Sequence, residues 1–168
     1  IGSAQRWRKI RRFFREGSAK EQEEEDYIAP VVLACMNMAR KKTGALIAIQ
    51  GTSDLTPYQH AGERFLAAVN ARLIETIFFK NSPLHDGAMI IAGGKICAAG
   101  CILPVASDTD LNKDLGLRHR SALGLSQKTD AKIIIISEER GTISLAYRSE
   151  IIVDITPDEL RALLSSED

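Results

Sequence analysis

The chain has 168 residues, of which 45% are hydrophobic and 26% are charged, and its 22 basic side chains balance 22 acidic ones. This length and composition suit one globular domain with a substantial core. A net charge of zero excludes a general attraction to nucleic acid or anionic lipid, so we expect no nucleic-acid partner, and any charged surface must be local.

The N-terminal segment separates its charges. Basic side chains dominate residues 1–16, and acidic ones dominate residues 21–26. Apolar side chains at helical spacing among the arginines are typical of a segment at the lipid headgroups, although a solvated leader has a similar composition. They are Trp7, Ile10, Phe13 and Phe14. The chain starts at Ile1 without Met and contains no run of 18 apolar residues. We therefore expect residues 1–26 to be a juxtamembrane leader behind a membrane anchor that is missing from this chain.

The three cysteines, Cys35, Cys97 and Cys101, follow no disulfide framework. An odd number without framework spacing favours a reducing compartment. The pair Cys97 and Cys101 supplies too few soft ligands for zinc. We expect all three to be small core residues.

The first half of the folded domain, residues 27–168, begins with a helix. Apolar residues at a spacing near 3.6 predict that helix over residues 27–42, and a short apolar run predicts a buried strand over residues 45–49. A weaker strand is expected within residues 60–69. A helical stripe then follows Asn70, which is a suitable N-cap.

The second half begins with a hairpin around Gly93-Gly94, with strands over residues 88–92 and 95–105. A polar loop follows, and the pattern next predicts a helix over residues 119–128.

The chain ends with three strands and a helix. Four consecutive isoleucines predict a buried strand over residues 132–137, followed by strands over residues 142–148 and 151–155. Thr156, with Pro157 and Glu159 after it, forms the capping-box pattern of a last helix. The elements interleave without strict alternation, which predicts an α/β fold: a mixed central sheet with helices on both faces.

Two short motifs carry the chemistry. Asp86-Gly87 places a carboxylate and a bare backbone where a strand begins, although such a pair alone is a common turn. Arg118-His119-Arg120 places cations at the start of a helix, where the helix dipole disfavours them unless they bind an anion. Arginine also matches phosphate bidentately. The two motifs together indicate a phosphate site beside a metal or hydroxyl site.

Glu138 and Glu139 end the isoleucine strand and can be read as metal ligands or as a charged turn. The chain has neither a Walker A motif nor a Rossmann fingerprint. Any nucleotide binding therefore follows another scheme.

Four segments of the chain resemble the diadenylate cyclase domain family, and in particular its membrane-anchored type. The resemblance covers roughly residues 28–165. Its most specific feature is Asp-Gly-Ala followed at this separation by Arg-His-Arg. The four segments are residues 43–47, 83–88, 116–122 and 137–144, the last with Ser137-Glu138-Glu139, Gly141 and Ser144.

The resemblance implies a nucleotidyltransferase that condenses two ATP molecules into cyclic di-AMP. Each 3′-hydroxyl attacks the α-phosphorus of the other ATP across a head-to-head homodimer, and two pyrophosphates leave. It implies a divalent metal (Mn²⁺, Mg²⁺ or Co²⁺), a cytoplasmic domain on a plasma-membrane anchor, and contact with the membrane only through the missing segment.

The resemblance also implies the site residues. Asp86 would hold the metal or accept the hydroxyl proton, and Gly87 would let the backbone approach the ribose. Leu103 would pack against adenine and bond it through its backbone, and Ser137 would reach the phosphates. Leu117 stands where many members have a Thr whose hydroxyl binds phosphate, so this chain lacks that hydroxyl contact. The implied catalytic residues are Asp86, Gly87, Ala88, Arg118, His119 and Arg120; the ATP-binding residues are Gly87, Leu103, Leu117, Arg118, His119, Arg120 and Ser137; the metal ligands are Asp86, Glu139 and His85.

Two other classes of function fit parts of the sequence. A nucleotide-sensing module would hold ATP or cyclic di-AMP without turnover, but the intact Asp86 and both arginines of the Arg-His-Arg motif argue against it. A membrane-surface adaptor would act through the basic leader alone.

Overall fold

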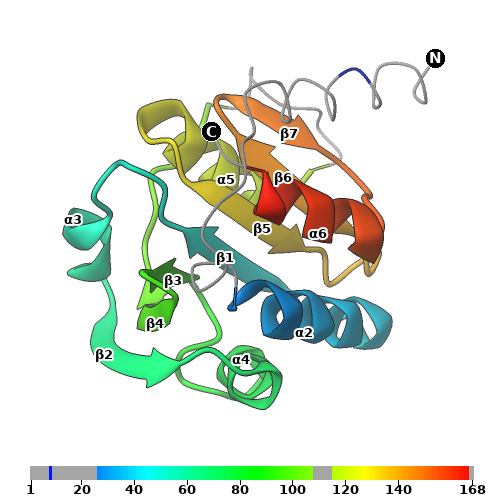
Figure 1. The fold of residues 1–168 in the computed structure, drawn as a ribbon, viewed down its shortest axis with the longest axis horizontal. Coiled ribbons are helices and arrows are strands. Elements are labelled where there is room, and N and C mark those ends of the chain that lie inside the picture. Colours follow the sequence, from blue (N-terminus) through cyan, green and yellow to red (C-terminus); the bar gives the residue numbers. More distant parts are fainter. Residues whose placement is uncertain (1–7, 9–25, 108–114, 167–168) are drawn as a thin grey trace.

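The computed structural model describes Arg8, residues 26–107 and residues 115–166. Within these residues seven strands form one mixed sheet in the order β2-β4-β3-β1-β5-β6-β7 (Figure 1). The strands are β1 Ala45–Ile49, β2 Glu63–Ala68, β3 Ala88–Ala92, β4 Lys95–Cys101, β5 Lys132–Ile136, β6 Ile143–Tyr147 and β7 Glu150–Ile152. The helices are α2 Ile28–Lys41, α3 Thr56–Gln59, α4 Ala71–Phe78, α5 Leu117–Lys128 and α6 Pro157–Ser165.

Helices cover both faces of the sheet. Figure 1 shows α2 and α6 in front of the strands and α5 behind them. In β1, Ile47 belongs to the core cluster under α2, α4 and α6, whereas Leu46 and Ala48 belong to the cluster under α5. A strand covered on both faces is apolar throughout, which explains why the central strands read as continuous apolar runs. The predicted α/β fold with a mixed sheet is confirmed.

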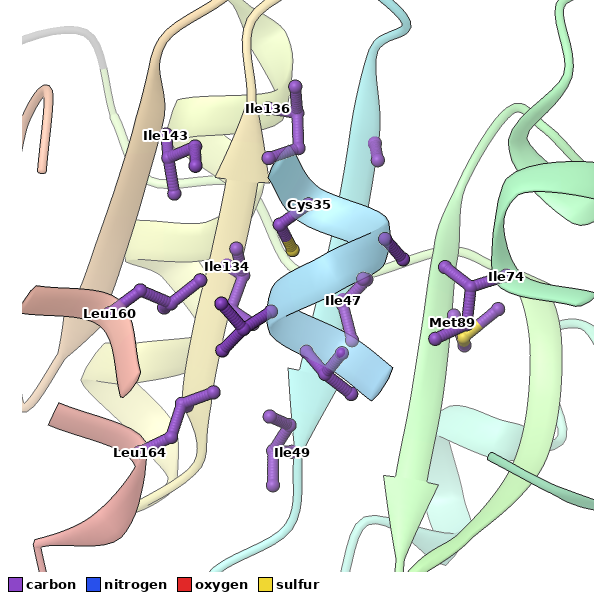
Figure 2. Packing of buried hydrophobic residues seen from close by; sticks show 14 of the residues in the cluster. Cys35, Ile47, Ile49, Ile74, Met89, Ile134, Ile136, Ile143, Leu160 and Leu164 are labelled. Carbon is purple, nitrogen blue, oxygen red and sulfur yellow. The ribbon is translucent and has the colours of Figure 1, made fainter. Parts of the chain in front are cut away.

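The core on the α2 face is built from side chains of widely separated elements. Figure 2 shows Cys35 of α2 lying between Ile47 and Ile134, with Ile74 of α4 beside Met89 of β3. Burial raises the pKa of the Cys35 thiol to about 12, so this cysteine is an inert packing residue. All three cysteines are free, as expected; Cys35 and Cys101 are buried and Cys97 is half-buried.

The predicted caps and the hairpin turn are confirmed. Asn70 accepts a hydrogen bond from the Leu73 amide at 2.8 Å. Thr156 and Glu159 form the full capping box of α6. Gly93 and Gly94 have φ of 59° and 75°, the left-handed pair that a two-residue hairpin turn requires.

Two boundaries differ from the sequence prediction. β4 ends at Cys101 instead of residue 105, and α5 begins at Leu117, two residues before the expected start. The cause is tertiary: beyond β4 the chain runs along α5, and the Ala106 amide donates to the Arg120 carbonyl at 3.0 Å. The whole Arg118–Arg120 motif therefore lies in the first turn of α5.

No helix within the described part of the chain is long and apolar enough to cross a bilayer. The juxtamembrane leader expected over residues 1–26 lies outside the described residues, apart from Arg8 and Asp26. Part of the polar loop before α5, residues 108–114, lies outside them too.

Asp130 fastens the loop after β1 to the start of β5. Its carboxylate accepts hydrogen bonds from the Thr52 and Ser53 amides, both at 2.8 Å, and from the Thr52 hydroxyl. Burial alone would raise the pKa of Asp130, but these hydrogen bonds outweigh it and hold the pKa at about 2. The ionised carboxylate is thus the form that the fold stabilises.

We expect Asp130→Asn to lower the unfolding free energy near pH 7 by roughly 1–2 kcal/mol, because a charged acceptor is lost. Since the folded pKa lies below the ordinary value of 3.8, this stabilisation is present above pH 3.8 and disappears as the pH falls toward 2. Thermal unfolding between pH 2 and 7 checks this: the gap between wild type and variant should close in acid. A constant gap would contradict it, and Glu63→Gln, which changes an exposed carboxylate of β2, is the control.

Candidate functional site

Three strand ends bring the sequence motifs to one edge of the sheet. β1 runs parallel to β3 and antiparallel to β5, with Ile47 opposite Met89 and Ala45 opposite Ile136. The starts of β1 and β3 and the end of β5 therefore lie at the same edge. These ends are flanked by Gly44 before β1, Asp86 before β3 and Ser137 after β5. Ser137 lies at this edge although it follows Asp86 by about 50 residues in the sequence.

Arg118 reaches this edge from the first turn of α5. A Cβ atom built on Gly44 would lie 2.5 Å from the Arg118 Cζ and Nη1 atoms, so the guanidinium lies directly against the glycine backbone. Arg118 Nη1 also donates to Glu138 Oε1 at 3.1 Å. Residues next to β1 and β5 thus fix the position of the Arg118 guanidinium, although Arg118 itself belongs to α5.

His119 is buried, with 6% of its surface exposed. Burial lowers its pKa, and the positive charges of Arg140 and Arg118 lower it further. The neutral imidazole is therefore favoured, and it can donate or accept a hydrogen bond without adding charge. Arg140 joins Arg118 as a cation around this side chain.

The turn after β5 is held by its own hydrogen bonds. The Gly141 amide donates to the Ser137 carbonyl at 2.8 Å, and the Arg140 amide donates to the Ser137 hydroxyl at 3.2 Å. Gly141 has φ of 69°, and a Cβ there would lie 2.6 Å from the Ala39 carbonyl oxygen of α2. The turn that carries Glu138 and Glu139 therefore packs closely on α2, and both carboxylates are exposed.

The loop before β3 orients His85 and leaves Asp86 exposed. His85 Nδ1 lies 2.8 Å from the Ser82 carbonyl oxygen. A carbonyl only accepts, so in the neutral imidazole Nδ1 carries the proton and Nε2 has a free lone pair. Gly87 has φ of 121°, and a Cβ there would lie 2.7 Å from the Gly100 carbonyl carbon. A glycine is thus needed at this position both for its conformation and for its contact with β4.

The remaining predicted residues lie around α5 and at the ends of β3 and β4. Ala88 opens β3 and is buried in the same core cluster as Leu103. Leu103 is 4% exposed, so its side chain belongs to the core, two residues beyond the end of β4. Leu117 is 60% exposed at the start of α5 and supplies no hydroxyl there. Arg120 is half-buried, and its carbonyl accepts from the Ala106 amide.

The donor atoms at this edge suit a hard divalent cation that also binds phosphate. In the described part of the chain, no three His, Cys, Asp or Glu side chains gather closely enough to hold a metal ion by themselves. Asp86 and Glu139 nevertheless offer exposed carboxylates, and His85 offers Nε2. Mg²⁺ in nucleotide enzymes is held by one or two carboxylates together with substrate phosphates, so the two carboxylates fit such an ion, whereas the His85 nitrogen is a softer donor.

Sequence reasoning missed three features of the site. They are the contact of Gly44 with Arg118, the ion pair of Glu138 with Arg118, and the positive charge of Arg140 near His119. The available signal for the first two was the pairing of two buried apolar strands, which brings the residues at their ends together.

Comparisons with known proteins agree on one family. A profile of the family described as "DisA bacterial checkpoint controller nucleotide-binding" matches residues 32–151. A diadenylate cyclase of Listeria monocytogenes is 39% identical over 155 residues, which are 92% of this chain and 57% of that protein. The cyclic di-AMP synthase CdaA of Bacillus subtilis is 37% identical over 157 residues, 93% of this chain and 58% of that protein.

Solved structures show the same fold. The crystal structure of a double mutant of DacA from Staphylococcus aureus has a TM-score of 0.82 at 38% identity, and the match covers 86% of this chain and 96% of that one. A hypothetical membrane spanning protein from Bacillus cereus has a TM-score of 0.75 at 34% identity, over 78% of this chain and 64% of that one. The chain spans a little under three fifths of the length of the first two curated relatives.

Proposed function

The chain belongs to the diadenylate cyclase domain family, and we propose from this membership that residues 27–168 form a catalytic domain that condenses two ATP molecules into cyclic di-AMP. The observation that supports the proposal is that Asp86 and the Arg118 guanidinium both lie at the sheet edge where β1 and β3 begin. A carboxylate that serves a hydroxyl and cations that serve a triphosphate are the two halves of a nucleotidyl transfer site.

Each transfer step is an in-line displacement. The 3′-oxygen of one ATP forms a bond to the α-phosphorus of the other, the bond from that phosphorus to the β-phosphate oxygen breaks, and pyrophosphate leaves. Two such steps close the ring and release two pyrophosphates. Catalysis of this kind depends mostly on positioning and on neutralising charge.

The side chains divide this work. Asp86 accepts the 3′-hydroxyl proton or orients the hydroxyl, and Gly87 lets the backbone approach the ribose. Arg118 and Arg120 bind the triphosphate by charge-assisted hydrogen bonds. His119, whose neutral form is favoured, orients a phosphate oxygen or the arginine beside it. The backbone at Leu103 and the Ser137 hydroxyl are the contacts that we assign to adenine and to phosphate.

His85, Asp86 and Glu139 are the residues that would hold the divalent ion. When bound, Mn²⁺, Mg²⁺ or Co²⁺ supplies positive charge to the α-phosphate and the leaving oxygen. The hydrogen bond from His85 Nδ1 to Ser82 supports this assignment, because metal-binding histidines usually bond through their second nitrogen to a carbonyl or carboxylate.

A second copy of the chain completes the reaction centre. One chain carries one Asp86 and one Arg-His-Arg motif, whereas the ring needs two hydroxyl attacks on two α-phosphates. A two-fold head-to-head dimer meets this requirement with identical half-sites. We therefore propose a homodimer as the active form.

The leader over residues 1–26 is proposed to join this domain to a membrane anchor on the cytoplasmic side. Basic residues near a bilayer are attracted to the anionic cytoplasmic leaflet. The similarity to a structure described as that of a hypothetical membrane spanning protein supports the same arrangement.

Incubation of the protein with ATP and Mn²⁺ or Mg²⁺ tests the activity. We expect cyclic di-AMP and two equivalents of pyrophosphate, measured by chromatography. Because two chains build one centre, the specific activity should rise with protein concentration until the dimer is saturated. Sedimentation at the same concentrations should give a matching dimerisation curve.

Folded, dimeric protein that binds ATP but yields no cyclic di-AMP with any of the three metals would reject the enzyme. It would support the nucleotide-sensing module in its place. A specific activity independent of concentration, in protein that sediments as a monomer, would reject the dimer requirement.

A further inference from the structure

The guanidinium group of Arg118 lies on a seat made by Gly44 and Glu138, which we call the arginine seat. The backbone of Gly44 lies so close beneath it that an added Cβ would sit 2.5 Å from Cζ and Nη1 and 2.8 Å from Nη2. Glu138 Oε1 accepts from Nη1 at 3.1 Å. Gly44 thus limits how the plane of the guanidinium lies, and Glu138 limits its rotation.

The two parts of the seat flank paired strands at the centre of the sheet. Gly44 precedes β1 and Glu138 follows β5, and the two strands pair along their full length from Ala45 opposite Ile136. The turn that carries Glu138 is held by the hydrogen bond from the Gly141 amide to the Ser137 carbonyl. Strand pairing and this turn hydrogen bond therefore fix where the backbones of Gly44 and Glu138 lie.

A reason for such a seat follows from the position of Arg118. In the first turn of α5 the helix dipole repels a cation, and a free arginine side chain has many rotamers to lose when it binds a ligand. Glu138 offsets the repulsion, and Gly44 restricts the rotamers. Preorganisation of this kind lowers the cost of binding.

We propose that Glu138 is a positioning residue that holds the Arg118 guanidinium on Gly44 in the orientation that receives the triphosphate of ATP. The inference rests on the proposed function for the identity of that ligand. Glu138 acts through Arg118, whereas Glu139, the next residue, is left to the divalent ion. The side-chain exposures of 26% for Arg118 and 61% for Glu138 leave the pair open to solvent and to a ligand.

The test compares Glu138→Ala, Glu138→Gln and Gly44→Ala, each alone and in an Arg118→Ala background. Calorimetry gives the Kd for ATP, and turnover gives KM and kcat. Glu138→Ala should raise Kd about two- to fivefold, the scale of one exposed ion pair. Glu138→Gln keeps an acceptor and should be affected less. Gly44→Ala should raise Kd more than either, since its methyl group displaces the flexible end of Arg118.

The Arg118→Ala background separates positioning from direct contact. If Glu138 and Gly44 act through Arg118, their substitutions should cause no further loss there, because coupled residues are non-additive. Full additivity would overturn the proposal. A fall in metal affinity with unchanged ATP affinity would also overturn it, by making Glu138 a metal ligand. Asp158→Asn, an exposed carboxylate in α6, controls for net charge and should match wild type.

The same measurements separate this inference from the proposed function. Product formation by the wild type decides the enzyme, whereas Kd for ATP decides the seat even if no product forms. A wild type that makes no product but shows the non-additive pattern in Kd retains the seat and loses the cyclase. A wild type that binds no ATP rejects both.

Discussion

Asp86→Asn should lower kcat by about two to four orders of magnitude while the Kd for ATP stays within about threefold of wild type. An amide has nearly the shape of the carboxylate but can neither accept the 3′-hydroxyl proton nor hold a metal ion with negative charge, and the loss of a general base has an effect of this size. Single-turnover measurement of cyclic di-AMP, beside calorimetry with ATP, checks the two quantities separately.

The position of Asp86 makes this variant informative. The residue is exposed and precedes β3, so the change removes charge without opening a cavity in the core. The melting temperature should therefore stay near that of wild type. Asp158→Asn serves as the matched control for charge. Near-normal turnover in Asp86→Asn would remove the residue from the chemistry and leave the loop before β3 as an ordinary turn.

Most of the fold could be predicted because its elements are locally consistent. The isoleucine run of β5, the Gly93-Gly94 turn and the capping box at Thr156 each specify their structure from a few neighbouring residues. The two misplaced boundaries, at the end of β4 and the start of α5, are different. There the Ala106 amide bonds to the Arg120 carbonyl, and a Cβ on Gly124 would lie 2.1 Å from the Pro104 carbonyl oxygen. Such contacts between distant segments leave no local pattern.

In the candidate site, too, features set by neighbouring residues could be predicted and contacts between distant segments could not. Asp86 and the Arg-His-Arg motif could be found from the sequence because each is an unusual local arrangement of charge. The partner of Arg118 could not be found in this way, because Glu138 and Glu139 are adjacent residues of the same type and nothing in the sequence distinguishes them. Only the conformation of the turn, with Gly141 against Ala39, decides which carboxylate meets the arginine.

Arg118→Ala should raise both the Kd and the KM for ATP about ten- to a hundredfold, the usual effect of removing a hydrogen bond to a charged group, and lower kcat less. The variant removes the guanidinium that lies between Gly44 and Glu138, so Glu138 is left at the phosphate site without its cation. Repulsion between that carboxylate and the triphosphate adds to the loss.

Arg118→Lys distinguishes charge from geometry. Lysine keeps the charge but lacks the planar fork that pairs with Glu138 and with phosphate, so the KM should recover only in part. Full recovery would mean that a point charge suffices and that the arginine seat has no role. The variant Arg118→Ala, Glu138→Gln completes the argument: it removes the repulsion as well as the cation. Its ATP affinity should therefore equal or exceed that of Arg118→Ala alone, and a further loss would contradict the assignment of both residues.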